Sequence, residues 1–229
     1  MSDVAIVTGG TGALGQAVVL RLLADGMTVC VPYVVDHEEK ALRGRVQAGA
    51  DRLLTRHADV TDPAAMDTFV ETVRREHGRI DALVAGVGGF AGGGLLDTDR
   101  ETWDRMIAMN LTSTFTAARA VVPHLAGAGR GRVVAVASRA VVPPAPGFIA
   151  YTVAKAGVIA FVQALAAEVR PRGITVNAVL PSTMDTPANR SAMPDADRAG
   201  WVPVESVASA IAFLLSDGAA HVTGALVTI

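Results

Sequence analysis

The sequence is poor in cysteine, aromatic residues and net charge. Cys30 is its one cysteine, so an intrachain disulfide is excluded, and its apolar neighbours predict a buried strand residue rather than a reactive thiol. A formal net charge of −2 gives no basic surface for nucleic acid or an anionic membrane, and we expect neither as a partner. Aromatic residues make up only 4% of the chain. Small and aliphatic residues dominate instead, which suits close packing of helices on a sheet.

Segments that direct a chain out of the cytoplasm are also not expected. The N-terminus enters a short apolar stretch at Val4 without the basic region or cleavage site of a signal peptide. We find no apolar run approaching the roughly 18 residues of a membrane helix. The sequence therefore predicts a cytoplasmic protein.

The remaining pattern alternates short β-branched runs with longer amphipathic ones. A chain of 229 residues fits one domain, residues 1–229. The alternation predicts an α/β fold, a doubly wound parallel sheet of about seven strands with helices on both faces. We expect strands at 4–7, 28–31, 82–85, 132–136, 174–179 and 225–229, and helices at 12–24, from Asp62, at 151–169 and at 204–215.

Three loose stretches follow predicted strands, at 86–94, 143–147 and 183–200. Ligands of open α/β sheets bind beyond the carboxyl ends of the strands, so we expect the site among these loops. Phe90, Phe148 and Trp201 are their aromatic members, and these rings either flank a flat or acyl substrate or close the loops on themselves.

The first strand runs into a glycine-rich turn, Thr8 to Gly15, with glycines at 9, 12 and 15. Glycine permits a tight turn and lets backbone approach a pyrophosphate, and the helix N-terminus that follows favours phosphate. The pattern therefore indicates a dinucleotide site, the alternative being a packing turn without a ligand.

The residues that would contact the adenosine half leave the cofactor's phosphate state open. Tyr33 stands where an acid usually binds the ribose, and Asp36 comes slightly late. The sequence therefore predicts NAD or NADP without choosing between them. Asp59 and Val60 either reach the adenine or form a turn before the Asp62 helix.

Tyr151 and Lys155 lie four residues apart on a predicted helix and share one face. A nearby ammonium favours the phenolate, which predicts a pKa for Tyr151 below its ordinary value of about 10 and proton transfer near neutral pH. The pair alone is also typical of a solvated helix face. Ser138, at the end of a strand, and Asn110, inside another helix, favour a site.

With these residues in place, the whole chain resembles the short-chain dehydrogenase/reductase family. The family's glycine loop matches Thr8 to Gly15, and its Asn-Ser-Tyr-Lys tetrad matches Asn110, Ser138, Tyr151 and Lys155. The resemblance implies a Rossmann-type fold, a small-molecule substrate and no metal. It also implies a set of cofactor contacts: Gly9, Thr11, Gly12, Ala13, Leu14, Tyr33, Asp59, Val60, Ala85, Gly86, Val87, Tyr151, Lys155, Pro181, Thr183 and Thr186.

The resemblance also implies a role for each member of the tetrad. Tyr151 would be the general acid in reduction and the base in oxidation, and Lys155 would lower its pKa and bind the nicotinamide ribose. Ser138 would polarise the substrate oxygen, and Asn110 would hold a water that resupplies protons. Structural alternatives are a strand-end turn at Ser138, a structural amide at Asn110 and a helix N-cap at Thr186.

A homodimer or homotetramer is implied as well, with the alanine-rich helices 114–126 and 158–169 facing a partner subunit. Ordinary packing of these helices on the sheet is the alternative.

Departures from the family pattern widen the range of substrates. Ala13 replaces a glycine, Ala85 to Gly88 replaces an Asn-Asn-Ala-Gly run, and Ser182 replaces another glycine. With the segment Leu180 to Asp197, these resemble quinonoid dihydropteridine reductases, which lack the tetrad's serine and asparagine. We therefore expect an oxidoreductase of a carbonyl or alcohol, such as a 3-oxoacyl compound or small ketone. The alternatives are a dihydropteridine-type reductase and a dinucleotide-sensing protein without turnover.

Overall fold

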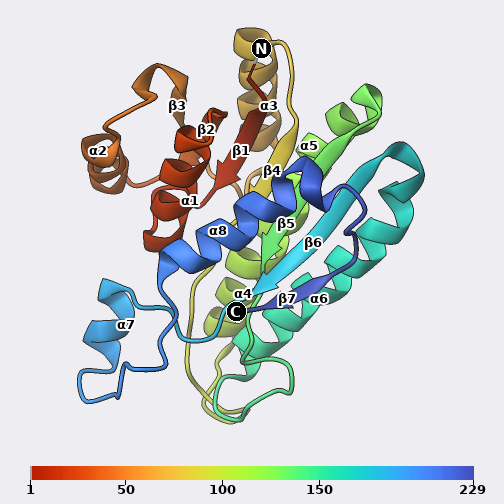
Figure 1. Cartoon of the computed structure of the whole chain (residues 1–229). Coiled ribbons are helices and arrows are strands. Elements are labelled where there is room, and N and C mark those ends of the chain that lie inside the picture. The colour runs from red at the N-terminus through yellow and green to blue at the C-terminus, as the bar shows by residue number, and fades with distance from the viewer. Residues whose placement is uncertain (1) are drawn as a thin grey trace.

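A computed structural model describes residues 2–229 as a parallel sheet covered by helices on both faces (Figure 1). The sheet has the order β3-β2-β1-β4-β5-β6-β7, and every neighbouring pair is parallel. Its strands are β1 Val4–Thr8, β2 Thr28–Tyr33, β3 Leu53–His57, β4 Ala82–Ala85, β5 Gly131–Val136, β6 Ile174–Leu180 and β7 Leu226–Thr228. This confirms the predicted doubly wound α/β fold.

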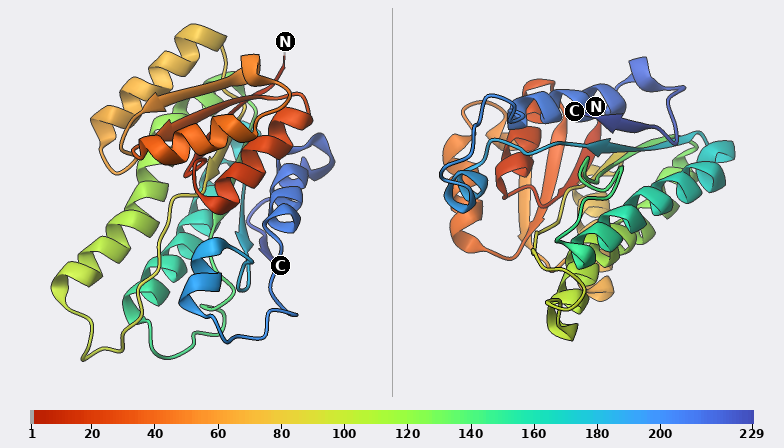
Figure 2. Two further views of the ribbon diagram at one scale, coloured as in Figure 1. Left: turned by 90° about the vertical axis from the view of Figure 1, so that its left-hand side faces the viewer. Right: turned by 90° about the horizontal axis from the view of Figure 1, so that it is seen from below.

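Two layers of helices cover the sheet, as the view from below in Figure 2 shows. One layer holds α1 Ala13–Ala24, α2 Asp36–Arg45 and α8 Val204–Leu215, and the other holds α3 Pro63–His77, α5 Ser113–Ala128 and α6 Ile149–Val169. The short helices α4 Arg100–Met106 and α7 Pro187–Ala192 lie in the connections. Each layer therefore buries its own apolar core against one face of the sheet.

Local sequence signals set the start of α3 and the apolar character of the central strands. Asp62 caps α3 by accepting a hydrogen bond from the backbone of Ala64 at 2.9 Å, and Pro63 opens the helix, as predicted. The central strands β1 and β4 are buried along their whole length, which is why they are continuous apolar runs. Cys30 is buried in β2, and burial raises the pKa of its thiol to about 12, which confirms the structural interpretation.

Two segments differ from the sequence-based expectation. The strand predicted at 28–31 extends to Tyr33, and Asp36 is the first residue of α2, whose acidic first turn complements the positive end of the helix dipole. The stretch 183–200 is not all loop, because it contains α7. Thr186 caps that helix by accepting a hydrogen bond from the backbone of Asn189 at 3.2 Å, so its predicted alternative as an N-cap is confirmed.

One expectation about apolar runs was wrong. Among residues 2–229, one helical stretch, Ile149–Arg172, is long and apolar enough to cross a membrane by length and composition, with a mean hydropathy of 1.6. Alanine, valine and leucine give α6 this character because the helix packs against β6 and its neighbours in one core. The same helix carries Tyr151 and Lys155.

Candidate active site

The predicted tetrad gathers at the carboxyl edge of the sheet. Ser138 follows β5 by two residues, Tyr151 and Lys155 occupy the first turns of α6, and Asn110 lies between α4 and α5. The strands that meet at this edge are parallel, so their following loops all leave on the same side. The fold thus places these residues as the sequence predicted, although they are far apart in the chain.

Burial dominates the protonation of Tyr151. It raises the pKa of the phenol, and a side-chain hydrogen bond with Ser138 opposes that shift only in part. The depression of this pKa by Lys155 that the sequence predicted is therefore not found, because the ammonium is turned toward another partner. A phenol with a raised pKa keeps its proton at neutral pH and can donate it.

The partner of Lys155 is the end of β5. Its Nζ donates a hydrogen bond to the backbone oxygen of Val136 at 2.8 Å, and the side chain is 5% exposed. Removal from water disfavours the charged form, and burial lowers the pKa of Lys155 from 10.5 to about 8. Lys155 is thus a buried cation that can lose its proton near neutral pH. It does not lie on a solvated helix face, which was the alternative that the sequence left open.

Asn110 lies in a π-helical turn, Ile107–Thr112, and is fully buried. Its Nδ2 donates to the backbone oxygens of Met106 at 3.0 Å and Gly89 at 3.1 Å, and its Oδ1 accepts from the Gly89 backbone at 3.1 Å. The side chain therefore fixes the loop after β4 through paired bonds to one residue. Single-turn π-helical segments are frequent at functional sites, because the extra residue redirects a side chain.

Gly88 brings the loop backbone close to both polar groups. A Cβ atom at this position would lie 2.7 Å from Oδ1 of Asn110 and 3.0 Å from Nζ of Lys155. Only glycine lets the chain pass there without displacing one of them. Gly88 and Gly89 thus lie at the site outside the tetrad, and they belong to the stretch 86–94 where the sequence predicted a site loop.

The glycine loop has the form of a phosphate cradle. Gly9 has a φ of +68° and its backbone approaches Gly86 so closely that a Cβ would lie 2.8 Å from the Gly86 carbonyl. Gly12 is the N-cap of α1, no side chain caps that helix, and a Cβ at Gly12 would meet no atom nearer than 3.5 Å. The N-terminus of a long helix is therefore left open to an anion, and the residues present fit a dinucleotide.

The remaining predicted cofactor residues line the same edge with different local roles. Tyr33 ends β2 and its ring packs edge-on against His57, with centroids 5.8 Å apart. The Asp59 carboxylate accepts hydrogen bonds from the backbone and hydroxyl of Thr61, at 2.8 and 2.7 Å, so it forms the predicted turn before α3. Ala13 and Leu14 open α1, Ala85 ends β4 ahead of Gly86 and Val87, and Pro181 and Thr183 follow β6.

Two aromatic rings lie beside Tyr151. The ring centroid of Phe90 lies 5.1 Å from that of Tyr151, and Phe148 lies 6.2 Å away. Backbone hydrogen bonds hold the two loops together, because Gly93 donates to Gly147 at 2.7 Å. Trp201, which the sequence grouped with these rings, instead has the Arg198 guanidinium 5.7 Å from its centroid.

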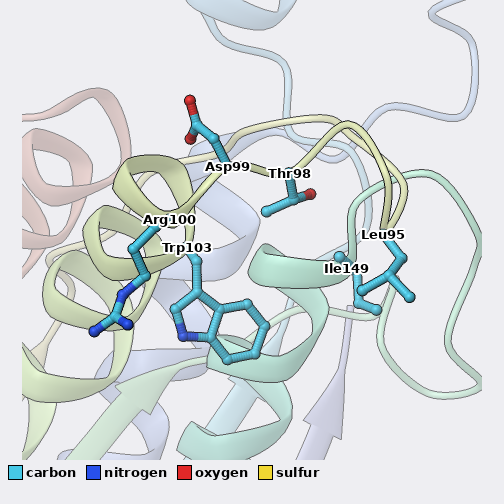
Figure 3. Close-up of a pocket in the computed structure, with 6 residues that line it drawn as sticks. All are labelled: Leu95, Thr98, Asp99, Arg100, Trp103 and Ile149. Atoms are coloured by element: carbon cyan, nitrogen blue, oxygen red, sulfur yellow. The ribbon is translucent and has the colours of Figure 1, made fainter.

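A cavity of about 300 Å³ opens beside the start of α6 (Figure 3). Its lining residues come from the loop after β4, the start of α4 and the start of α6: Leu95, Thr98, Asp99, Arg100, Trp103 and Ile149. Ile149 is the first residue of α6, the helix that also carries Tyr151. It offers mixed polar and apolar walls to a molecule larger than the reacting group.

Comparison with known proteins assigns the class. The family model for short chain dehydrogenases matches residues 3–197, and the chain belongs to the short-chain dehydrogenase/reductase family. It is therefore an NAD(P)-dependent oxidoreductase of carbonyl and alcohol groups, as the tetrad predicted.

Individual relatives match along nearly the full length. The 3-oxoacyl-[acyl-carrier-protein] reductase FabG of Escherichia coli is 34% identical, with 96% of this chain and 93% of the relative covered. The 2-(R)-hydroxypropyl-CoM dehydrogenase of Xanthobacter autotrophicus is 33% identical, with 98% and 96% covered. Among solved structures, levodione reductase has a TM-score of 0.92 at 26% identity, over 99% of this chain and 95% of that one.

The lowered pKa of Lys155 predicts a pH dependence of stability. Between the folded-state value of about 8 and the ordinary 10.5, the unfolded chain binds more protons than the folded chain, so stability increases as pH rises. Relative to Lys155→Met, which cannot titrate there, we expect the wild type to gain about 2 kcal/mol of unfolding free energy between about pH 7 and pH 10.

Urea unfolding of the wild type and Lys155→Met across this range measures the effect, because all other titrating groups are common to both. A difference between the two proteins that is independent of pH would contradict a buried, titrating ammonium.

Proposed function

We propose that this enzyme interconverts a carbonyl and an alcohol, with Tyr151 as the acid–base group. The observation that carries the proposal is the placement of Tyr151 one helical turn before the buried Lys155, at the sheet edge that also holds Ser138 and the glycine cradle. A substrate oxygen placed between the two hydroxyl groups would receive hydrogen bonds from both.

The residues divide the chemistry between them. In reduction, the electron pair of the carbonyl moves onto its oxygen, and Tyr151 donates the proton that this oxygen takes up. Ser138 orients the same oxygen and stabilises the phenolate that remains. In oxidation the proton moves in the opposite direction. A bound dinucleotide supplies or accepts the hydride, and the glycine loop with the residues predicted from the resemblance would hold it.

Lys155 and Asn110 act on the surroundings of the reaction. Lys155 lies one helical turn from Tyr151 with its ammonium bonded to the Val136 carbonyl, and it would bind the nicotinamide ribose, as the resemblance implies. Asn110 holds the backbone of Gly89, and through it the loop that covers Lys155. A structural amide at Asn110 is the alternative that the sequence left open. These hydrogen bonds support a positioning role for Asn110, in addition to any part it has in proton supply.

For the substrate, we propose a 3-oxoacyl compound or a small ketone. The support comes from the complete tetrad and from the relatives, which include a 3-oxoacyl-[acyl-carrier-protein] reductase. Phe90 and Phe148 offer apolar surface next to Tyr151, and the cavity at Ile149 offers room for the rest of the molecule. The dihydropteridine alternative is not favoured by these comparisons.

We further propose that residues 1–229 act as one domain in the cytoplasm and assemble as a homodimer or homotetramer through α5 and α6. Phe115 of α5 is 49% exposed and packs edge-on with Phe161 of α6, and Val153 is 41% exposed. An apolar face of this kind on two adjacent helices is typical of a subunit interface.

The assembly can be tested by mass in solution. We expect light scattering to give two or four times the chain mass of 23.5 kDa, and Phe115→Glu to shift it toward the monomer, because a charge in a buried contact opposes association. The matched control is Phe213→Glu on α8, which is exposed outside this face. A wild-type mass equal to one chain would contradict the proposal.

The acid–base role is tested by Tyr151→Phe. A panel of ketones, 3-oxoacyl thioesters and quinonoid dihydropterin, each with NADH and with NADPH, first identifies a substrate. With that substrate, we expect Tyr151→Phe to lower kcat by about 10²–10⁴, because the proton donor is lost, while the Kd of the dinucleotide changes little.

The control is Thr152→Val, which removes a neighbouring hydroxyl that has no hydrogen-bond partner in the described chain and should retain activity. Full turnover by Tyr151→Phe would exclude the proposed mechanism. Activity with quinonoid dihydropterin alone would favour the alternative substrate class.

A further inference from the structure

A carboxylate from α2 reaches into the glycine loop. The Thr11 hydroxyl donates a hydrogen bond to Oε2 of Glu38 at 2.9 Å, and Thr11 is 7% exposed. Thr11 directly precedes Gly12, the N-cap of α1, and Glu38 lies in the first turn of α2. A negative charge is thus fixed beside the loop that forms the phosphate cradle, although the two residues are distant in sequence.

The topology explains this contact. Strands β1 and β2 are parallel neighbours, with Val4 opposite Thr28, so the loops that follow them leave from the same sheet edge. The loop after β2 leads to α2, whose first turn faces the glycine loop. The end of β2 itself offers only the neutral side chain of Tyr33. Glu38 therefore brings to this edge the acid that the strand end lacks.

The cations nearest to this contact in sequence have other partners. Arg43 binds Glu39 and Thr55, and Arg45 donates to Oε1 of Gln16 at 2.9 Å. Lys40 is exposed, and its positive charge helps to lower the pKa of the Glu39 carboxyl. The first turn of α2 carries two further acids, Asp36 and Glu39. The contact with Thr11 is thus made by a carboxylate in an acidic turn and involves no guanidinium.

This arrangement discriminates between the two dinucleotides. An adenosine ribose presents hydroxyl groups, which donate hydrogen bonds to a carboxylate. A 2′-phosphate carries up to two negative charges and requires cationic partners, so a fixed carboxylate at short range repels it. We infer that Glu38, held by Thr11, makes this enzyme bind NADH in preference to NADPH. The inference rests on the proposed function, since it concerns the same cofactor site.

Equilibrium binding tests the inference without a substrate. Isothermal titration calorimetry of the wild type with NADH and with NADPH should give a Kd at least about tenfold lower for NADH. Glu38→Gln keeps an oxygen to accept the Thr11 hydrogen bond but removes the charge. We expect it to narrow the ratio of the two Kd values about fivefold or more, chiefly by tighter binding of NADPH.

Two further variants complete the design. Glu38→Arg places a cation where the carboxylate was and should reverse the preference toward NADPH. Glu168→Gln is the control. Glu168 is an exposed acid at the C-terminal end of α6, and its substitution changes the net charge by the same amount as Glu38→Gln. It should leave the ratio of the two Kd values as in the wild type. Circular dichroism establishes that each variant is folded before its affinities are compared.

The outcomes separate this inference from the proposed function. Equal affinity for both dinucleotides, a preference for NADPH, or an unchanged ratio in Glu38→Gln overturns the assignment of Glu38 and leaves the oxidoreductase standing. A wild type that binds neither NADH nor NADPH overturns the proposed function itself.

Discussion

The candidate active site depends on a buried ammonium group. An ammonium removed from water is costly unless it is hydrogen-bonded, and Nζ of Lys155 donates to the carbonyl of Val136 at the end of β5. The loop packs against this ammonium at Gly88, where a Cβ atom would lie only 3.0 Å from Nζ. Asn110 holds that backbone from a π-helical turn. Helix, strand and loop are thus fixed around one charge.

The catalytic and nucleotide sides of the site share this framework. The backbone of Gly86 donates to the backbone and the hydroxyl oxygen of Thr8, each at 3.2 Å, which joins the loop after β4 to the start of the glycine loop. Displacement of the loop would therefore disturb both the phosphate cradle and the cover over Lys155. This coupling explains why glycines recur on both sides: two backbone segments meet where side chains would keep them apart.

Sequence patterns predicted the features that depend on local chemistry. Alternating apolar runs gave the strands, Asp62 and Pro63 gave the start of α3, and the spacing of Tyr151 and Lys155 gave their common helix face. Sequence patterns could not predict the features that depend on contacts between distant segments. The position of Glu38 beside Thr11 requires two strands to be neighbours, the π-helical turn at Asn110 gives no periodic signal, and the raised pKa of Tyr151 results from burial by loops.

The central claim is that the groups at this edge support direct hydride transfer between a nicotinamide and a carbonyl carbon. Mass spectrometry of the alcohol formed from a ketone substrate and a dinucleotide deuterated at C4 of the nicotinamide tests it most directly. The account predicts one deuterium on the carbinol carbon when the deuterium occupies one face of the ring, and none when it occupies the other. Deuterium absent from the product with both labelled forms would contradict it.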